Sequence, residues 1–295
     1  AYLFPPLVFN WLVKKGGKVR YRPITLKKIL YTGFCAATFF MQLLTAYILG
    51  FFLFVLTRPT PRKRLWFHRY NCSVFRFDIK RMPGIKLVFE NEYFEDFEKP
   101  AVIICNHQSL LDSFCMMFLS PKVILLANDH ISVNPIIRII FNWSNFISAA
   151  DGASNIVEKV RPLVSEGYSI AIFPEGERAE NGESCKVKRF HKGAFHLAEE
   201  LDLDIIPVYF YGLTEIMPKG SALSNGGTMY IAIGKRILVE KLSKISDLAC
   251  QAKILRNHYN EQIAMIHKKI MTPEEVAPIA FEKYLYKGRD IEVSA

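Results

Sequence analysis

The sequence has no closely paired cysteines, no internal repeat and no low-complexity tract among its 295 residues. Its six cysteines occur without any CxxC spacing, and Cys105 and Cys115 lie in apolar runs typical of a protein core. This distribution argues against a disulfide framework and favours a reducing compartment. An HExxH motif is also missing, so His191 and His196 do not predict a metal site, and we expect no metal or other cofactor.

Charge is missing from one long segment near the start of the chain. Residues Ile29 to Thr57 include no charged side chain and no histidine over 29 positions. As a helix this segment would measure roughly 43 Å, whereas the hydrocarbon core of a bilayer is about 30 Å thick. A buried core helix is the alternative, but the length favours a segment embedded in a membrane.

Negative charge is scarce relative to positive charge, since 38 Lys and Arg residues against 28 Asp and Glu give a formal net charge of +10. Such an excess suits either nucleic acid or an anionic membrane surface. The basic residues flank the apolar segment on both sides, which favours membrane lipids as partners and predicts no nucleic-acid partner. They are Lys14, Lys15, Lys18, Arg20, Arg22, Lys27 and Lys28 before it, and Arg58, Arg62, Lys63, Arg64 and Arg69 after it.

Basic residues on both flanks conflict with a simple crossing, because the positive-inside rule would place both ends of the segment in the cytoplasm. A re-entrant or interfacial pair of helices resolves the conflict. The amphipathic stretch from Leu65 to Phe75 would supply the second helix of this pair.

A candidate catalytic pair stands near the middle of the chain, where Asp112 follows His107 by five positions. A neutral imidazole can take a proton from an attacking hydroxyl, and a carboxylate can fix its tautomer and stabilise the imidazolium. The preceding residues, Ala101 to Cys105 (AVIIC), predict a short buried strand, so His107 lies on a strand-to-helix turn, where α/β proteins place reactive groups. An alternative remains for Asp112, because Ser109 to Asp112 also fits a capping box at the start of a helix.

Three segments resemble motifs of the glycerolipid acyltransferase family, whose best-known members acylate lysophosphatidic acid. The segment from Asn106 to Asp112 is similar to the first motif, and Phe173-Pro174-Glu175-Gly176-Glu177-Arg178 is similar to the third. Ile206-Pro207-Val208, ahead of Gly212, resembles the fourth. All three segments occur in the family's order, and the resemblance covers roughly residues 84 to 240.

The resemblance implies a mechanism and a set of site residues. His107 would be the general base and Asp112 its partner, and a lipid hydroxyl would attack an acyl thioester directly, without an acyl-enzyme intermediate. The substrate-binding residues in these motifs would be Asn106, Glu175, Gly176, Arg178 and Pro207. The donor would be acyl-CoA or acyl carrier protein, and a two-helix membrane element would precede the catalytic domain.

The chain departs from the family at positions suited to hold a phosphate. The positions that the second motif usually fills with lysine, leucine, proline and glycine are here Asn128, Ile131, Pro135 and Arg138. No arginine occurs between Ser148 and Gly152, and Glu177 stands where the third motif usually has threonine. Arginine forks and lysine charges hold phosphate best, so an acceptor without phosphate stays open beside lysophosphatidate.

Further cations follow the third motif at Lys188, Arg189 and Lys192. A charge run is usually a solvated surface, but these residues precede a predicted helix from Ala194 to Leu201, and the start of a helix favours anions. We therefore add all three to the predicted substrate-binding residues, where the anion would be an acceptor head group or the phosphates of a thioester carrier.

The order of elements predicts an α/β fold with a mixed, mostly parallel sheet flanked by helices, preceded by the N-terminal two-helix membrane element. Strands are expected near 84–90, 101–105, 123–127, 169–173, 205–210 and 229–233, with helices such as 154–166 and 246–270. The predicted domains are a membrane-associated helical region over 1–80, a catalytic domain over 81–272 and a C-terminal helical tail over 273–295. Because residues 1–13 are typical of the end of another membrane helix, we expect one module of a longer polypeptide, with a fused lipid exporter as a partner.

Two classes of function follow. The first is a membrane-bound acyltransferase that acylates a lyso-lipid hydroxyl, foremost 1-acyl-glycerol-3-phosphate, with a phosphate-free lyso-lipid such as an acylated amino acid as the alternative. The second is a non-catalytic lipid-binding module attached to an exporter. In either case we expect the chain at the cell membrane, with its catalytic domain on the cytoplasmic side.

Overall fold

The computed structural model describes residues 25–127, 139–140, 142–144, 146–149, 152–180, 184–219, 224–245 and 247–271. The second motif, from Asn128 to Arg138, lies outside these residues, as do the predicted tail over 273–295 and the basic positions from Lys14 to Arg22. Expectations for those segments stay predictions.

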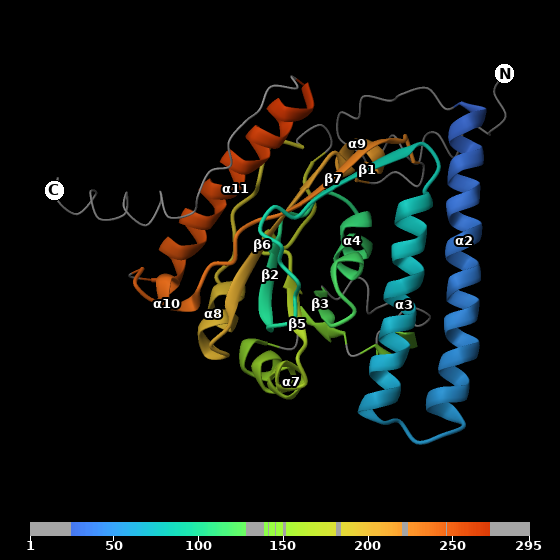
Figure 1. Cartoon of the computed structure of the whole chain (residues 1–295), viewed down its shortest axis with the longest axis horizontal. Helices are drawn as coiled ribbons and strands as arrows, with labels where there is room; N and C mark the ends of the chain where they lie inside the picture. The colour runs from blue at the N-terminus through green and yellow to red at the C-terminus, as the bar shows by residue number, and fades with distance from the viewer. Residues whose placement is uncertain are drawn as a thin grey trace.

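The described residues form a seven-stranded sheet with the strand order β1-β7-β6-β2-β5-β3-β4 (Figure 1). The strands are β1 (Ile85–Glu90), β2 (Ala101–Cys105), β3 (Val123–Ala127), β4 (Ile147–Ser148), β5 (Ser169–Ile172), β6 (Asp204–Tyr211) and β7 (Gly227–Ile233). Neighbouring strands are parallel except for β6 and β7, which are antiparallel. The predicted mixed, mostly parallel α/β sheet is therefore confirmed. Only the two-residue β4 was not expected from the sequence, because two residues are too few to show an alternating pattern.

Helices cover both faces of this sheet. They are α4 (Leu111–Leu119), α7 (Ala153–Ser165), α8 (Gly193–Glu200), α9 (Leu213–Ile216), α10 (Val239–Leu242) and α11 (Leu248–Met271). Side chains alternate along a strand, and in β2 Val102 and Ile104 join a core cluster with α7, α8 and α11, whereas Ile103 and Cys105 join a second cluster with α4 and α9. All five residues of β2 are buried, as expected for a strand in the middle of a covered, mostly parallel sheet.

The apolar N-terminal segment forms one long helix at the outer edge of the molecule (Figure 1). Helix α2 (Leu26–Gly50) begins after Thr25, whose side-chain oxygen accepts the N–H of Lys28, and continues into the π-helical turn η1 (Phe51–Val55). Within the described residues, the run from Leu26 to Val55 is the one helix long and apolar enough to cross a membrane.

The second predicted helix is α3 (Pro61–Arg81), which runs back beside α2 (Figure 1). Its start combines Pro61 at the first helical position with Thr60, whose side chain accepts a backbone N–H. The inner side of α3 packs on the sheet domain and buries Phe67, Cys72 and Ile79. The predicted boundary at residue 80 lies next to the end of α3 at Arg81, and the domain division itself stays a prediction.

Candidate active site

Three segments with sequence motifs meet at one edge of the sheet. Strands β6, β2 and β5 are parallel neighbours, so their carboxyl ends lie side by side. Asn106 follows β2 and begins the first motif, and Phe173 follows β5 and begins the third motif. Gly212 follows β6, which contains the fourth motif. Parallel α/β sheets bind ligands outside the carboxyl ends of their strands, so this edge is the candidate active site.

His107 and Asp112 form a close pair at this edge. The Nδ1 atom of His107 lies 2.8 Å from Oδ2 of Asp112. Asp112 is fully buried, whereas 18% of the His107 side chain remains exposed. A carboxylate partner assigns the proton of the neutral ring to Nδ1 and leaves the lone pair on Nε2. The pair thus has the arrangement of a general base held by an orienting carboxylate.

Asp112 also organises the start of helix α4. Its Oδ2 accepts the backbone N–H groups of Gln108 and Ser109 in addition to the imidazole. The residue before the helix, Leu110, provides no side-chain cap, whereas the Ser109 hydroxyl donates to the Met217 carbonyl and accepts the N–H of Leu111. The same oxygen, Oδ2, therefore makes the contact expected of a catalytic partner and the contacts expected of a helix cap, so the structure agrees with both hypotheses for Asp112.

The burial of Asp112 has an electrostatic consequence. Burial raises the pKa of this carboxyl above its usual value, while the hydrogen bond from His107 lowers it in part. The second oxygen, Oδ1, is buried without a hydrogen-bond partner among the described residues. The imidazole and two backbone amides on Oδ2 therefore provide the compensation that a buried carboxylate requires.

The imidazole ring is held on a second side by Phe173. The two ring centroids are 4.2 Å apart and the ring planes differ by 17°, which is a stacked arrangement. Stacking on Phe173 and bonding to Asp112 leave the ring of His107 little freedom to rotate. The sequence indicated Phe173 only as the first residue of the third motif, and no sequence pattern predicted its contact with His107.

Glu175 links two segments of the site by accepting their backbone N–H groups. One of its carboxyl oxygens accepts the N–H of His107 at 2.7 Å, and the other accepts the N–H of Lys188 at 2.7 Å. The side chain is buried, and burial raises the pKa of Glu175 to about 7. Each oxygen of Glu175 thus accepts a backbone N–H, which positions His107, and the predicted contact of Glu175 with substrate stays a prediction.

Asn106 likewise bonds to the protein backbone. Its side-chain amide donates to the carbonyl of Phe210 and accepts the N–H of the same residue, each at 2.8 Å. This exchange extends the pairing of β2 and β6 beyond the end of β2. Asn106 therefore positions the turn that carries His107, and its expected contact with substrate stays a prediction.

Gln108 was missed by the sequence analysis. Its side chain accepts the N–H of Leu213 and donates to the carbonyl of Ser184, which joins the first motif to the segments that follow the third and fourth motifs. The residue type gave no signal, because its two partners lie 76 and 105 positions away.

Pro207 was also expected to contact substrate, and it lies buried inside β6, paired with Ile104 of β2. Proline has no N–H to donate within a sheet. Beside it, the Tyr259 hydroxyl from α11 donates to the Ile104 carbonyl and accepts the N–H of Val208. Pro207 and Tyr259 therefore shape the sheet beneath the site, and a contact of Pro207 with substrate stays a prediction. The sequence did not indicate Tyr259.

Gly176 forms the turn of the third motif. Its φ of +71° lies in the left-handed region, which glycine adopts without steric cost. A Cβ here would lie 3.4 Å from ring atoms of His191. The geometry explains the glycine through the backbone, and a contact with substrate stays a prediction.

The predicted cations lie in different environments. Lys188 is occupied, because its Nζ lies 3.0 Å from Glu177 and 3.5 Å from Glu180. Arg189 is exposed, and Arg178 is partly buried without an ion pair among the described residues. Arg178 is therefore the available cation of the third motif.

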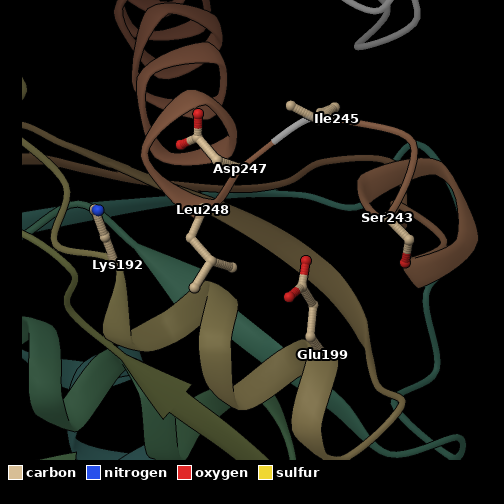
Figure 2. A pocket seen from close by; sticks show the side chains of 6 residues that line it. All are labelled: Lys192, Glu199, Ser243, Ile245, Asp247 and Leu248. Carbon is tan, nitrogen blue, oxygen red and sulfur yellow. The ribbon is translucent and has the colours of Figure 1, made fainter.

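Lys192 belongs to a different part of the surface. It lines an open hollow of about 550 Å³ between α8 and the start of α11 (Figure 2). The other lining residues are Glu199, Ser243, Ile245, Asp247 and Leu248. None of these is a motif residue, and a contact of Lys192 with substrate stays a prediction.

The described part of the chain contains no group of three or more His, Cys, Asp or Glu side chains arranged to hold a metal ion. His191 and His196, which the sequence analysis considered as metal ligands, therefore form no such group with other described residues.

Comparison with known proteins supports this architecture. A family model described as "Acyltransferase" matches residues 86–211. A chloroplastic 1-acyl-sn-glycerol-3-phosphate acyltransferase of Arabidopsis thaliana is 29% identical over 208 residues, which are 68% of this chain and 56% of that protein. A 1-acyl-sn-glycerol-3-phosphate acyltransferase of Cocos nucifera is 26% identical over 86% of this chain and 78% of that protein.

A solved structure has the same fold. The crystal structure of a 1-acyl-sn-glycerophosphate acyltransferase from Thermotoga maritima matches with a TM-score of 0.68 and 17% identity, over 82% of this chain and 97% of that chain. The chain spans about half the length of several curated relatives that it matches.

The chain is thus an α/β protein with a mostly parallel sheet, in which a histidine and a carboxylate are paired at the carboxyl edge of the central strand β2. The chain therefore carries a segment that the "Acyltransferase" family model matches, and it is similar in sequence to 1-acyl-sn-glycerol-3-phosphate acyltransferases.

Proposed function

We propose that this chain is a membrane-bound acyltransferase that moves a fatty acyl group from an acyl thioester to a lyso-lipid hydroxyl. The observation that carries the proposal is the 2.8 Å contact between His107 Nδ1 and Asp112 Oδ2 at the carboxyl edge of β2. A non-catalytic lipid-binding module would not need a buried carboxylate that orients a partly exposed imidazole, since burying a charge costs free energy.

In the proposed reaction, Nε2 of His107 takes the proton of the acceptor hydroxyl while the hydroxyl oxygen attacks the thioester carbonyl carbon. Asp112 stabilises the imidazolium that results. The tetrahedral intermediate then collapses, the carbon–sulfur bond breaks, and the departing sulfur receives the proton from the imidazolium. The products are an ester and a free thiol, and no residue of the chain becomes acylated.

The proposed acceptor is 1-acyl-glycerol-3-phosphate. The relatives are named as 1-acyl-sn-glycerol-3-phosphate acyltransferases, which supports this choice, and Arg178 offers a guanidinium fork suited to a phosphate. A phosphate-free lyso-lipid, such as an acylated amino acid, is the second candidate. It is favoured by one observation, which is that Lys188 and Lys219 are already paired with Glu177 and Glu180.

We further propose acyl-CoA or acyl carrier protein as the donor and the cell membrane as the location, with the catalytic domain on the cytoplasmic side. The apolar run from Leu26 to Val55 supports membrane attachment by its length and composition. The basic flanks of the apolar segment support the cytoplasmic placement.

The test is an assay of the purified protein with lipid vesicles that contain either lysophosphatidate or a phosphate-free lyso-lipid. Each acceptor is offered with acyl-CoA and, separately, with acyl carrier protein, and the esters are identified by mass spectrometry. We expect His107-dependent acylation of lysophosphatidate. Acylation of the phosphate-free lipid alone would select the second candidate, and no acylation with any pair of substrates would contradict the proposed function.

A further inference from the structure

An ion-pair network lies beside the candidate active site, and the proposed mechanism does not use it. Lys188 Nζ is 3.0 Å from Glu177 and 3.5 Å from Glu180, and Lys219 Nζ is 2.6 Å from Glu180 and 3.8 Å from Glu177. We call these four residues the rim network. It joins the third-motif loop to the segment that follows α9, which is the continuation of the fourth motif.

The rim network is connected to the catalytic histidine through the backbone. Lys188 donates its N–H to one oxygen of Glu175, whose other oxygen accepts the N–H of His107. The ammonium group of Lys188 also donates to the carbonyl of Arg178. The network is therefore anchored to the same carboxylate that positions the general base, and it adjoins the available cation of the third motif.

The ion pairs of the rim network are of a kind in which a phosphate can replace the glutamates. Both lysines have the chemistry of phosphate ligands, but each is occupied by carboxylates of the same chain. Lys188 lowers the pKa of Glu177, so this glutamate is ionised at neutral pH. Glu177 is 62% exposed and Glu180 is 56% exposed, and exposed ion pairs contribute little to stability. An arriving phosphate dianion can therefore replace the carboxylates at small cost.

We propose that Glu177 and Glu180 are specificity residues that act as internal competitors of the acceptor phosphate, by occupying Lys188 and Lys219 until the phosphate displaces them. The inference rests on the proposed function, and it assigns roles to Lys219 and to both glutamates at the same site. Its consequence is a weakened affinity for phosphate-bearing acceptors at an unchanged rate of acyl transfer.

The test compares Glu177→Gln and the double variant Glu177→Gln/Glu180→Gln with the wild type. The KM for lysophosphatidate should fall about two- to fivefold in the single variant and further in the double variant, the size expected for one exposed ion pair. The kcat should stay within about twofold, because His107 and Asp112 are untouched. Lys219→Gln should raise the KM instead.

Glu158→Gln is the matched control, since it removes the same charge from an exposed position on α7. Its KM should equal that of the wild type. A phosphate-free acceptor supplies the second control, and its KM should not respond to Glu177→Gln. Together these controls separate local competition for phosphate from a general change in net charge.

Binding of inorganic phosphate, measured by titration calorimetry, tests the network without any turnover. We expect phosphate to bind the double variant more tightly than the wild type and the Glu158→Gln variant. Unchanged phosphate affinity, an unchanged KM or a raised KM in Glu177→Gln would overturn the inference while leaving acyl transfer intact. Absence of acyl transfer in the wild type would instead contradict the proposed function, and the phosphate titration would still decide the inference.

Discussion

The active-site edge and helix α2 depart from the usual distribution of side chains in opposite ways. At the edge, charged groups are buried, with Asp112 fully enclosed and Glu175 4% exposed. On α2, large apolar groups are exposed, and Phe40 is 67% exposed. Both departures cost free energy in water unless something compensates, so each marks a site that serves a purpose beyond folding.

The compensation differs between the two regions. The buried carboxylates are compensated from within, by backbone amides and an imidazole. Helix α2 finds little compensation within the described chain, because Ala46 and Gly50 are its buried residues. Helix α11, of similar length, buries seven residues against the sheet domain. The buried carboxylates at the edge are therefore stabilised by groups of the same chain. The exposed apolar side chains of α2 need an apolar surrounding that the described residues do not provide.

The largest expected effect comes from removing the general base. His107→Ala should reduce acyl transfer at least about a hundredfold, the low end of general-base contributions, because no other group takes the hydroxyl proton. The assay is acyl transfer by protein whose fold is verified by circular dichroism. His196→Ala, on α8, is the matched control and should retain normal turnover. Near-normal turnover by folded His107→Ala would remove this residue from the mechanism.

A smaller loss of turnover is expected when the side chain at position 112 keeps the shape of aspartate but loses its charge. In Asp112→Asn the amide oxygen can still accept the N–H groups of Gln108 and Ser109, and the amide nitrogen can take the place of the unpartnered Oδ1. Turnover should fall at least about tenfold, because a neutral amide does not stabilise the imidazolium, while the melting temperature changes little. A large loss of melting temperature with full activity per folded molecule would instead assign Asp112 to helix capping alone.

The proposed contact of α2 with the membrane can be tested by placing charges on the exposed face of the helix. Phe40→Lys with Leu44→Lys should lower the vesicle-bound fraction about tenfold or more, since each exposed side chain contributes about 1.5–3 kcal/mol when it enters an apolar phase. Turnover with detergent-dispersed lipid should stay normal. Leu238→Lys, at an exposed position outside α2, is the control. Unchanged vesicle binding in the double variant would mean that α2 is not the membrane contact.

The smallest expected effect is a pH-dependent stability difference at Glu175. Burial raises the pKa of Glu175 in the folded protein to about 7, from an ordinary value of 4.5, so the folded state favours the protonated acid. The stability of the wild type relative to Glu175→Gln should therefore be greatest below pH 4.5, fall as the pH rises to about 7 and stay level above it.

Thermal melts of the wild type and the Glu175→Gln variant at pH 5 and pH 8 check this expectation, with a difference of a few degrees. A larger advantage of the wild type at pH 8 would show the opposite, namely that the two backbone amides keep Glu175 ionised in the folded protein.

Much of the fold was predictable from local patterns. The fully apolar run AVIIC predicted a buried central strand, and Ala101–Cys105 forms β2 with those bounds. The apolar segment after Lys28 predicted a long helix, which is α2. The short β4 was missed, because its formation depends on pairing with β3 and not on its own residues.

The candidate site was predictable only in part. The spacing of His107 and Asp112 indicated their pairing, since a turn followed by a helix start brings them together. The roles of Asn106 and Glu175 depended on which strands are neighbours, and nothing local fixes the order β6-β2-β5. Residue type likewise identified Lys188 as a cation but could not reveal that glutamates of the same loop occupy it.

Trp143 gives the molecule a built-in optical reporter. Its indole stacks on Phe54 of η1 at 5.6 Å and meets Phe67 of α3 edge to face at 5.9 Å. It also lies where a Cβ on Gly50 would stand, so only glycine leaves room for it. Separation of the helix pair from the sheet domain would move this indole from an aromatic cage into a more polar surrounding. Its fluorescence would then shift to longer wavelength, which makes docking of the two helices visible without any added label.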